Sequence, residues 1–132
     1  MKKTCKALAV GAALLLAACT ADTNPGTPEE ATRAFIEAVA SFDAETIVKL
    51  TAGYADMTAD EQQAALEQAR KEAKDVAPIQ KDIVKRLLKD VTISEVKVDG
   101  DRATVTLKDE SDTRDILVKK EKDGTWRVAY GL

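Results

Sequence analysis

The amino-acid sequence predicts an α+β domain in which N-terminal helices pack on one face of a four-stranded antiparallel C-terminal sheet. Two observations predict this arrangement. Apolar side chains recur with helical spacing between residues 27 and 89, and from residue 91 onward they alternate with polar side chains, which is typical of strands. The length of 132 residues is that of one domain, which we place at residues 27–132.

The composition argues against two classes of function. The chain has 20 basic and 23 acidic side chains, no histidine and a formal charge of −3 at pH 7. Because several lysines lie in the leader described next, the chain without that leader is more acidic still. A mildly acidic domain is a poor candidate for nucleic-acid binding, and we expect no nucleic-acid partner. Without histidine, acid–base catalysis near neutral pH lacks its usual group.

Residues 1–18 have the pattern of a secretory signal peptide. Three lysines, Lys2, Lys3 and Lys6, precede the stretch from Ala7 to Ala18, which is apolar without interruption. As a helix that stretch would reach about 18 Å, whereas the hydrocarbon core of a bilayer is about 30 Å thick. The pattern therefore predicts export and not a membrane span.

The end of this leader, Leu16-Ala17-Ala18-Cys19, closely resembles the lipobox of bacterial lipoproteins. The resemblance implies cleavage before Cys19, which then carries a diacylglyceryl thioether (palmitate or a similar chain) and an N-acyl group. Several acyl chains would anchor the protein stably in a membrane. Thr20, where inner-membrane lipoproteins carry aspartate, implies the outer membrane of the bacterial cell envelope, with the domain facing the periplasm. An ordinary signal peptide with a cysteine near its end is the alternative.

Residues 19–26 form the lipidated cysteine and a flexible tether in this interpretation. Thr20–Gly26 is polar, contains a Pro-Gly pair and has no periodicity. Cys5 leaves with the leader and Cys19 is alkylated, so we expect no free thiol, disulfide or thiolate metal ligand in the mature domain.

Four helical segments follow. A capping box at Thr27–Glu30 opens the first, which runs to about Ser41. Asp43 caps a short second helix that we expect to close at Gly53 in a left-handed conformation. A second capping box, Thr58–Glu61, opens a helix to about Asp75, and a fourth helix follows Pro78 over Ile79–Lys89.

The C-terminal part predicts four strands, with glycine-containing hairpin turns between the first two and the last two. The strands are expected at Val91–Val98, Arg102–Lys108, Arg114–Glu121 and Thr125–Tyr130. The alternation slips near Ser94-Glu95, which predicts a bulge there. The apolar phase of the strands predicts these core residues: Val91, Ile93, Val96, Val98, Ala103, Val105, Leu107, Ile116, Val118, Trp126, Val128 and Tyr130. The opposite phase, which includes Thr104, Thr106, Thr125 and Arg127, predicts a solvated face.

Several of these motifs resemble one superfamily. They are Pro28-Glu29-Glu30-Ala31 and Phe35-Ile36-Glu37-Ala38 in the first helix, the Asp43 start of the second, and the closing Asp123-Gly124-Thr125-Trp126-Arg127-Val128. From Thr27 to its end the chain looks like small lipoprotein families of unknown function, some described as lumazine-binding, in the nuclear-transport-factor-2-like (cystatin-like) superfamily. The resemblance implies a cystatin-like roll with a cone between helix and curved sheet. Ketosteroid isomerase-like members place carboxylates, tyrosines or histidines in that cone.

The residues supply little for catalysis. The apolar phase of the strands contains no carboxylate, Asp56 precedes a helix cap, and Glu37 is expected on an exposed helical face. Serine and threonine have no histidine to activate them. We therefore expect no catalytic residue, no cofactor and no enzyme; an isomerase or dehydratase with an ionisable group buried in the cone is the alternative.

Charged side chains outside the strands have simple interpretations. The acidic turn residues do not have EF-hand spacing, so solvated turns are favoured and no metal site is expected. Lys81, Lys85 and Lys89 lie four residues apart, with Arg86 nearby, and could meet anionic lipid or glycan, but a solvated helix face is the favoured interpretation.

Three aromatic side chains carry a polar group: Tyr54, Trp126 and Tyr130. They are the candidate ligand contacts, although a tryptophan on a terminal strand more often fills a core. The sequence thus predicts a lipid-anchored domain that binds or supports an assembly. An envelope protein and a small apolar ligand are both open as its partner.

Overall fold

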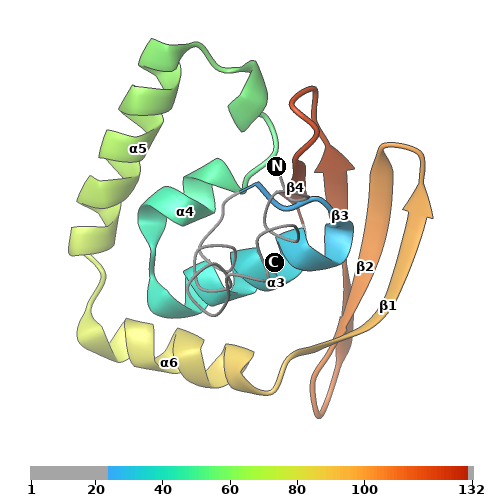
Figure 1. Cartoon of the computed structure of the whole chain (residues 1–132). Helices are drawn as coiled ribbons and strands as arrows, with labels where there is room; N and C mark the ends of the chain where they lie inside the picture. The colour runs from blue at the N-terminus through green and yellow to red at the C-terminus, as the bar shows by residue number, and fades with distance from the viewer. Residues whose placement is uncertain (1–23, 131–132) are drawn as a thin grey trace, which may run out of the picture.

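The computed structural model describes residues 24–130, and the predicted leader and Cys19 lie outside this part. Its elements confirm the α+β class (Figure 1). The helical elements are α3 (Pro28–Ser41), α4 (Ala44–Lys49), the 3₁₀ helix η2 (Tyr54–Asp56), α5 (Ala59–Lys74) and α6 (Pro78–Lys89). The strands are β1 (Thr92–Asp99), β2 (Arg102–Lys108), β3 (Thr113–Lys120) and β4 (Trp126–Tyr130).

The strands form one antiparallel meander in the order β1-β2-β3-β4. Gly100, in the turn between β1 and β2, has a φ of 64°, and Gly124, in the turn before β4, has a φ of 81°. An L side chain is disfavoured at such angles, which explains why glycine stands at both predicted hairpin turns.

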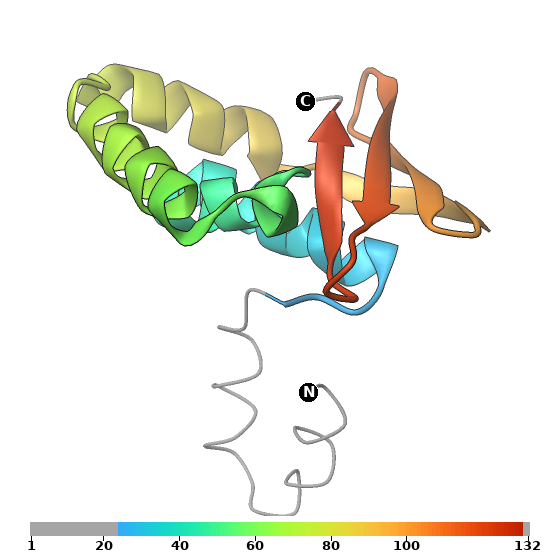
Figure 2. The same cartoon turned by 90° about the horizontal axis from the view of Figure 1, so that it is seen from above.

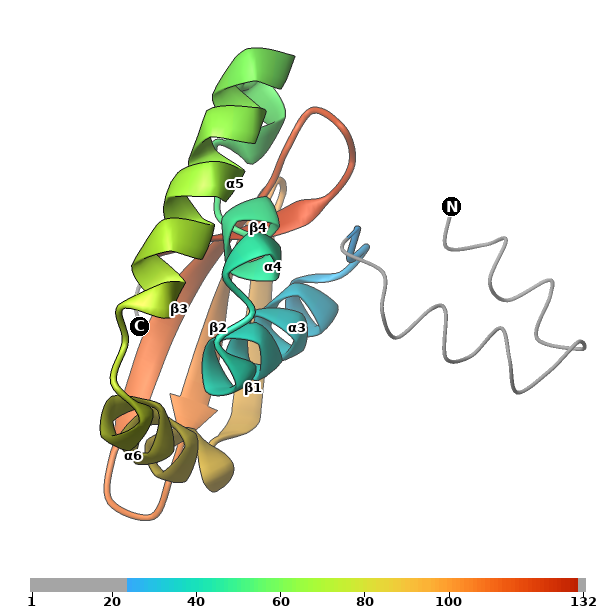
Figure 3. The same ribbon diagram turned by 90° about the vertical axis from the view of Figure 1, so that its left-hand side faces the viewer.

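The helices are not equally close to the sheet. α3 packs along all four strands, whereas α5 packs mainly on α4 and α6 mainly on α3. Figure 2 shows α5 and α6 projecting from one side of the sheet, and Figure 3 shows the bend between them. α3 therefore supplies most of the helical layer over the sheet, and α6 keeps much of its apolar surface uncovered.

The core lies between α3 and the sheet and confirms most of the predicted strand phase. Its buried members are Ala31, Ala103, Val105, Leu107, Ile116, Val118, Trp126 and Val128. Val98 was predicted in this set but lies at the hairpin end of the edge strand β1 and is 58% exposed.

The predicted solvated face is wrong at β4. Thr125 and Arg127 are both 3% exposed. Residues 49–55 lie against Arg127: its guanidinium bonds the Lys49 carbonyl, and the backbone at Leu50 and Ala52 bonds Val128. The Thr125 hydroxyl bonds Asn24 Oδ1 at 3.4 Å. Segments distant in sequence thus bury side chains that strand alternation alone assigns to solvent.

Two bulges shift the register of the sheet. The first, between Ile93 and Glu95, confirms the predicted slip. The second was not predicted: Val118 pairs with Val128, whereas Leu117 pairs with Tyr130. The regular alternation that the sequence analysis assumed through the end of β4 therefore breaks after Val128.

The helix caps follow the prediction with two differences. Thr58 and Glu61 form the complete capping box of α5, and Asp43 caps α4. At α3, Thr27 accepts the Glu30 N–H at 3.1 Å, but the Glu30 carboxylate accepts the N–H of Gly26 instead of that of Thr27. α4 ends at Lys49, so the left-handed Gly53 (φ 102°) precedes η2 and does not close the helix.

The folded part begins before the predicted boundary at Thr27. Pro25 is buried, and its carbonyl accepts the Trp126 N–H at 3.0 Å. The last residues of the predicted tether 19–26 therefore pack against β4. Among residues 24–130, no helix combines the length and apolar character that crossing a membrane requires.

Candidate functional site

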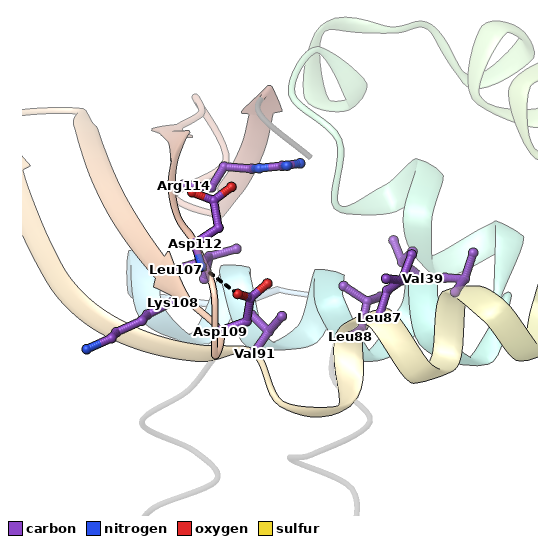
Figure 4. Close-up of a pocket in the computed structure, with 10 residues that line it drawn as sticks. Val39, Leu87, Leu88, Val91, Leu107, Lys108, Asp109, Asp112 and Arg114 are labelled. Atoms are coloured by element: carbon purple, nitrogen blue, oxygen red, sulfur yellow. Dashed lines mark hydrogen bonds between the residues drawn. The ribbon is translucent and has the colours of Figure 1, made fainter.

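A half-open groove of about 300 Å³ lies between α6, the end of α3 and the end of the sheet at the β2–β3 turn (Figure 4). Six apolar side chains line it: Val39, Val84, Leu87, Leu88, Val91 and Leu107. Four charged residues, Lys108, Asp109, Asp112 and Arg114, line it on the sheet side. The groove is therefore apolar on its helix side and charged along one rim.

α6 provides the apolar wall and extends it beyond the groove. Pro78 begins the helix, and the Gln80 side chain accepts the N–H of Ala77. Val84 and Leu88 are half-buried against the groove. Ile79, Ile83 and Leu87, which we call the α6 stripe, are 69%, 49% and 67% exposed. Their i, i+4, i+8 spacing places them on one helical face, adjacent to the groove.

The two acids on the rim are engaged by their own turn. Asp109 Oδ1 accepts the N–H groups of Ser111 and Asp112, each at 2.8 Å, and the Ser111 hydroxyl at 3.3 Å. The N–H of Ser111 and then that of Asp112 lower the pKa of Asp109. Asp112 Oδ1 in turn accepts the Thr113 N–H at 2.8 Å. A carboxylate stabilised in its ionised form is a poor general base near neutral pH.

Arg114 differs from these acids. It pairs with the buried Leu107 across the β2–β3 ladder, so its side chain leaves the sheet on the face that carries the core. Its charge contributes to the lowered pKa of Asp109, after the hydrogen bonds from Ser111 and Asp112, yet it forms no hydrogen bond or ion pair with residues 24–130. In Figure 4 the Arg114 side chain reaches over the groove, whereas Lys108 points away.

A second polar cluster lies at the opposite end of the sheet, around Arg127. Its guanidinium donates to the Lys49 carbonyl at 2.6 Å, to Glu121 at 3.2 Å and to Asp123 at 3.0 Å. The guanidinium also lies 5.4 Å from the centre of the Tyr54 ring. No buried side-chain polar atom of the described residues lacks a partner. The Nε and Nη1 donors of Arg127 thus serve a structural network that joins β4 to residues 49–55.

The aromatic residues predicted as ligand contacts do not meet at the groove. Tyr54 stacks with Arg127, and Trp126 fills the core. The backbone of Tyr130 pairs with Leu117, and its side chain lies outside the described part. Cys19 also lies outside residues 24–130.

The acids and lysines singled out in the sequence lie on the surface. Glu37 is exposed, and Asp56 is exposed and 3.5 Å from Lys122. Lys81 lies over the Phe42 ring at 5.9 Å. Residues 24–130 contain no group of three or more side chains placed to hold a metal ion.

The groove was not predicted from the sequence, although two signals pointed to it. Ile79 and Ile83 give α6 more apolar residues than one packed face requires. Arg114 occupies the same alternating phase as Ile116 and Val118, so it places a charge on the inner face of β3.

No protein-family model matches the chain, and no curated protein matches it. A solved structure from Campylobacter jejuni, described as a candidate NTF2-like transpeptidase, is similar with a TM-score of 0.51 and 15% sequence identity. The alignment covers 79% of this chain and 98% of that one. This likeness, together with the helices and the antiparallel sheet described above, shows that the chain has the NTF2-like (nuclear-transport-factor-2-like) fold.

Proposed function

We propose that this protein is a lipid-anchored binding module of the bacterial cell envelope, that it does not catalyse a reaction, and that its binding site is the groove beside α6. The observation that carries this proposal is the character of the groove. Its helix side is apolar, and its acids are engaged by backbone N–H groups of the β2–β3 turn. Such a surface takes up apolar groups and offers no ready proton acceptor.

An enzymatic role is the second candidate, because the similar structure from Campylobacter jejuni is described as a candidate transpeptidase. The residues of this chain favour binding instead. The sequence has no histidine, and Cys5 and Cys19, its two cysteines, belong to the predicted leader and lipidation site. A serine or threonine nucleophile at the groove would lack an evident base to activate it.

The position of the groove suits a protein anchored at Cys19. The described chain begins beside Trp126, close to the end of β3 at Lys120, whereas the groove lies at the other end of β3, next to Thr113. β3 has eight residues, which span roughly 25 Å at about 3.3 Å per residue. An anchor at Cys19 would thus attach the domain by one end and leave the groove at the other.

Cell fractionation tests the anchor. The Cys19→Ala protein should appear in the soluble fraction, whereas the matched Cys5→Ala protein, altered in the leader before the cleavage site, should stay with the membranes. A Cys19→Ala protein that still sediments with salt-washed membranes would contradict the proposed anchor.

Binding of the neutral apolar dye Nile red tests the groove. Val84→Phe adds bulk inside it, and Val98→Phe adds the same bulk at an exposed site on β1. We expect dye fluorescence to rise with the unmodified domain and with Val98→Phe, and to fall markedly with Val84→Phe. Equal dye binding by both variants, or none by the unmodified domain, would show that the groove is not the binding site.

A further inference from the structure

The apolar surface at α6 is longer than the groove itself. The α6 stripe runs from Ile79 to Leu87, which is about 12 Å along the helix at about 1.5 Å per residue. Leu87 belongs both to the stripe and to the groove lining, so the two surfaces are continuous. A groove of about 300 Å³ that continues into an apolar strip offers an elongated apolar surface, which suits an extended hydrocarbon chain.

Of the charged residues on the sheet-side rim, Arg114 is the one placed to contact a ligand in the groove. Asp109 and Asp112 direct carboxylate oxygens to N–H groups of their own turn. Arg114 has no hydrogen bond or ion pair with the described residues and reaches over the groove (Figure 4). The Arg114 side chain is exposed, so a ligand can reach it, and a guanidinium suits a carboxylate, which it can hold with two parallel hydrogen bonds.

We propose that the groove and the α6 stripe bind an anionic amphiphile with a single hydrocarbon chain, of the fatty-acid class. Its carboxylate pairs with Arg114, and its chain lies between Leu88 and Leu107 and continues along the stripe. This proposal rests on the proposed binding function of the groove and adds the chemical class of the ligand.

An amphipathic helix of a partner protein is a weaker fit to the same surface. The acid and base on the solvent side of α6, Asp82 and Arg86, already pair with each other at 2.6 Å. Lys85 and Lys89 form no ion pair with the described residues, so the free charge that α6 adds beside the stripe is positive. A cation that reaches over the groove at one end of an apolar strip matches a ligand with one anionic end.

Displacement of Nile red from the purified lipid-free domain tests the proposal, with decanoate and decanol as probes of equal chain length. We expect decanoate to displace the dye at about tenfold lower concentration than decanol. Octanoate, decanoate and dodecanoate should bind progressively more tightly, by up to about fourfold per buried methylene.

Substitution of the cation identifies the head-group contact. Arg114→Gln should lose the tenfold preference for decanoate and leave decanol binding unchanged. Lys108→Gln is the matched control, because Lys108 lines the same rim but points away from the groove. Its preference should equal that of the unmodified domain. Unchanged thermal unfolding of both variants establishes that each is folded.

The outcomes separate this proposal from the proposed function. Equal displacement by acid and alcohol, or a preference that survives Arg114→Gln, would overturn the head-group assignment while the groove remains a binding site. Displacement by neither probe would overturn the assignment of a hydrocarbon-chain ligand, as would displacement by an amphipathic helical peptide alone. Failure of Nile red itself to bind would instead contradict the proposed function.

Discussion

The guanidinium of Arg127 lies 3.2 Å from the carboxylate of Glu121, and the two side chains are only 4% and 10% exposed. The same carboxylate accepts the backbone N–H groups of Gly53 at 2.7 Å and Ala55 at 3.3 Å. This pair therefore joins β4 and the β3–β4 turn to the segment between α4 and α5. Its hydrogen bonds satisfy groups that would be costly to bury alone.

Removing the cation should be strongly destabilising. Arg127→Leu leaves the Glu121 carboxylate buried without its counter-ion, and we expect a loss of roughly 3 kcal/mol in the free energy of unfolding. Urea denaturation measures it. Arg102→Leu, which removes an exposed arginine of β2, is the control and should change stability by less than about 0.5 kcal/mol. Similar losses for the two variants would show that the buried pair is not a stabilising connection.

Acid should weaken this region. Burial raises the pKa of Asp123, but the Thr125 N–H and the Arg127 guanidinium outweigh burial and leave that pKa below its usual value. A carboxyl group with a lowered pKa in the folded state stabilises the protein above its unfolded pKa of about 3.9, and this stabilisation is lost as the pH falls through the folded value.

We therefore expect the free energy of unfolding to decline below about pH 4, and to decline less steeply in Asp123→Asn. Urea titrations between about pH 6 and about pH 3 measure both slopes. Asp101→Asn is the control, because Asp101 is exposed and no interaction of its carboxylate is observed, and it should keep the slope of the unmodified protein. Identical slopes for all three proteins would rule out a contribution from Asp123.

The strand phase makes a stability prediction. Val105 is fully buried, so Val105→Asp places an unpaired charge in the core and should cost several kcal/mol, roughly 3 or more. Thr106 is an unsuitable control because it pairs with Asp115, and a second acid there would add repulsion. Thr104→Asp, opposite Lys97, should cost little. Thermal melting measures both effects. Similar melting temperatures for Val105→Asp and Thr104→Asp would contradict the assignment of Val105 to the core face of β2.

The capping box of α5 makes a local prediction. Thr58 Oγ1 accepts the Glu61 N–H at 3.2 Å, and the Glu61 carboxylate accepts the Thr58 N–H at 2.8 Å. Thr58→Ala should destabilise α5 by about 1 kcal/mol, whereas Thr58→Ser keeps the hydroxyl and should have a smaller effect. In Thr58→Ala, hydrogen exchange should accelerate more for the backbone amides of α5 than for those of β2. Equal protection of α5 in the alanine and serine variants would show that the cap adds little.

Much of the fold could be predicted from sequence because it rests on interactions between near neighbours. The capping box at Thr58 joins residues three apart, and the hairpin turns need the backbone angles that Gly100 and Gly124 allow. Helical spacing and strand alternation predicted which residues would face a core, since the two periods place side chains on faces in fixed ways. These features determined the α+β class and most of the buried residues.

The tertiary structure alone decided the features that connect distant segments. Alternation assigned Arg127 to solvent, but residues 49–55 fold over β4 and supply partners for its charge. The groove likewise forms where α6 ends near the β2–β3 turn, and neither segment contains a motif that marks the other. Sequence periodicity describes one element at a time, whereas the burial of a charge and the shape of a cavity depend on which elements the completed fold brings together.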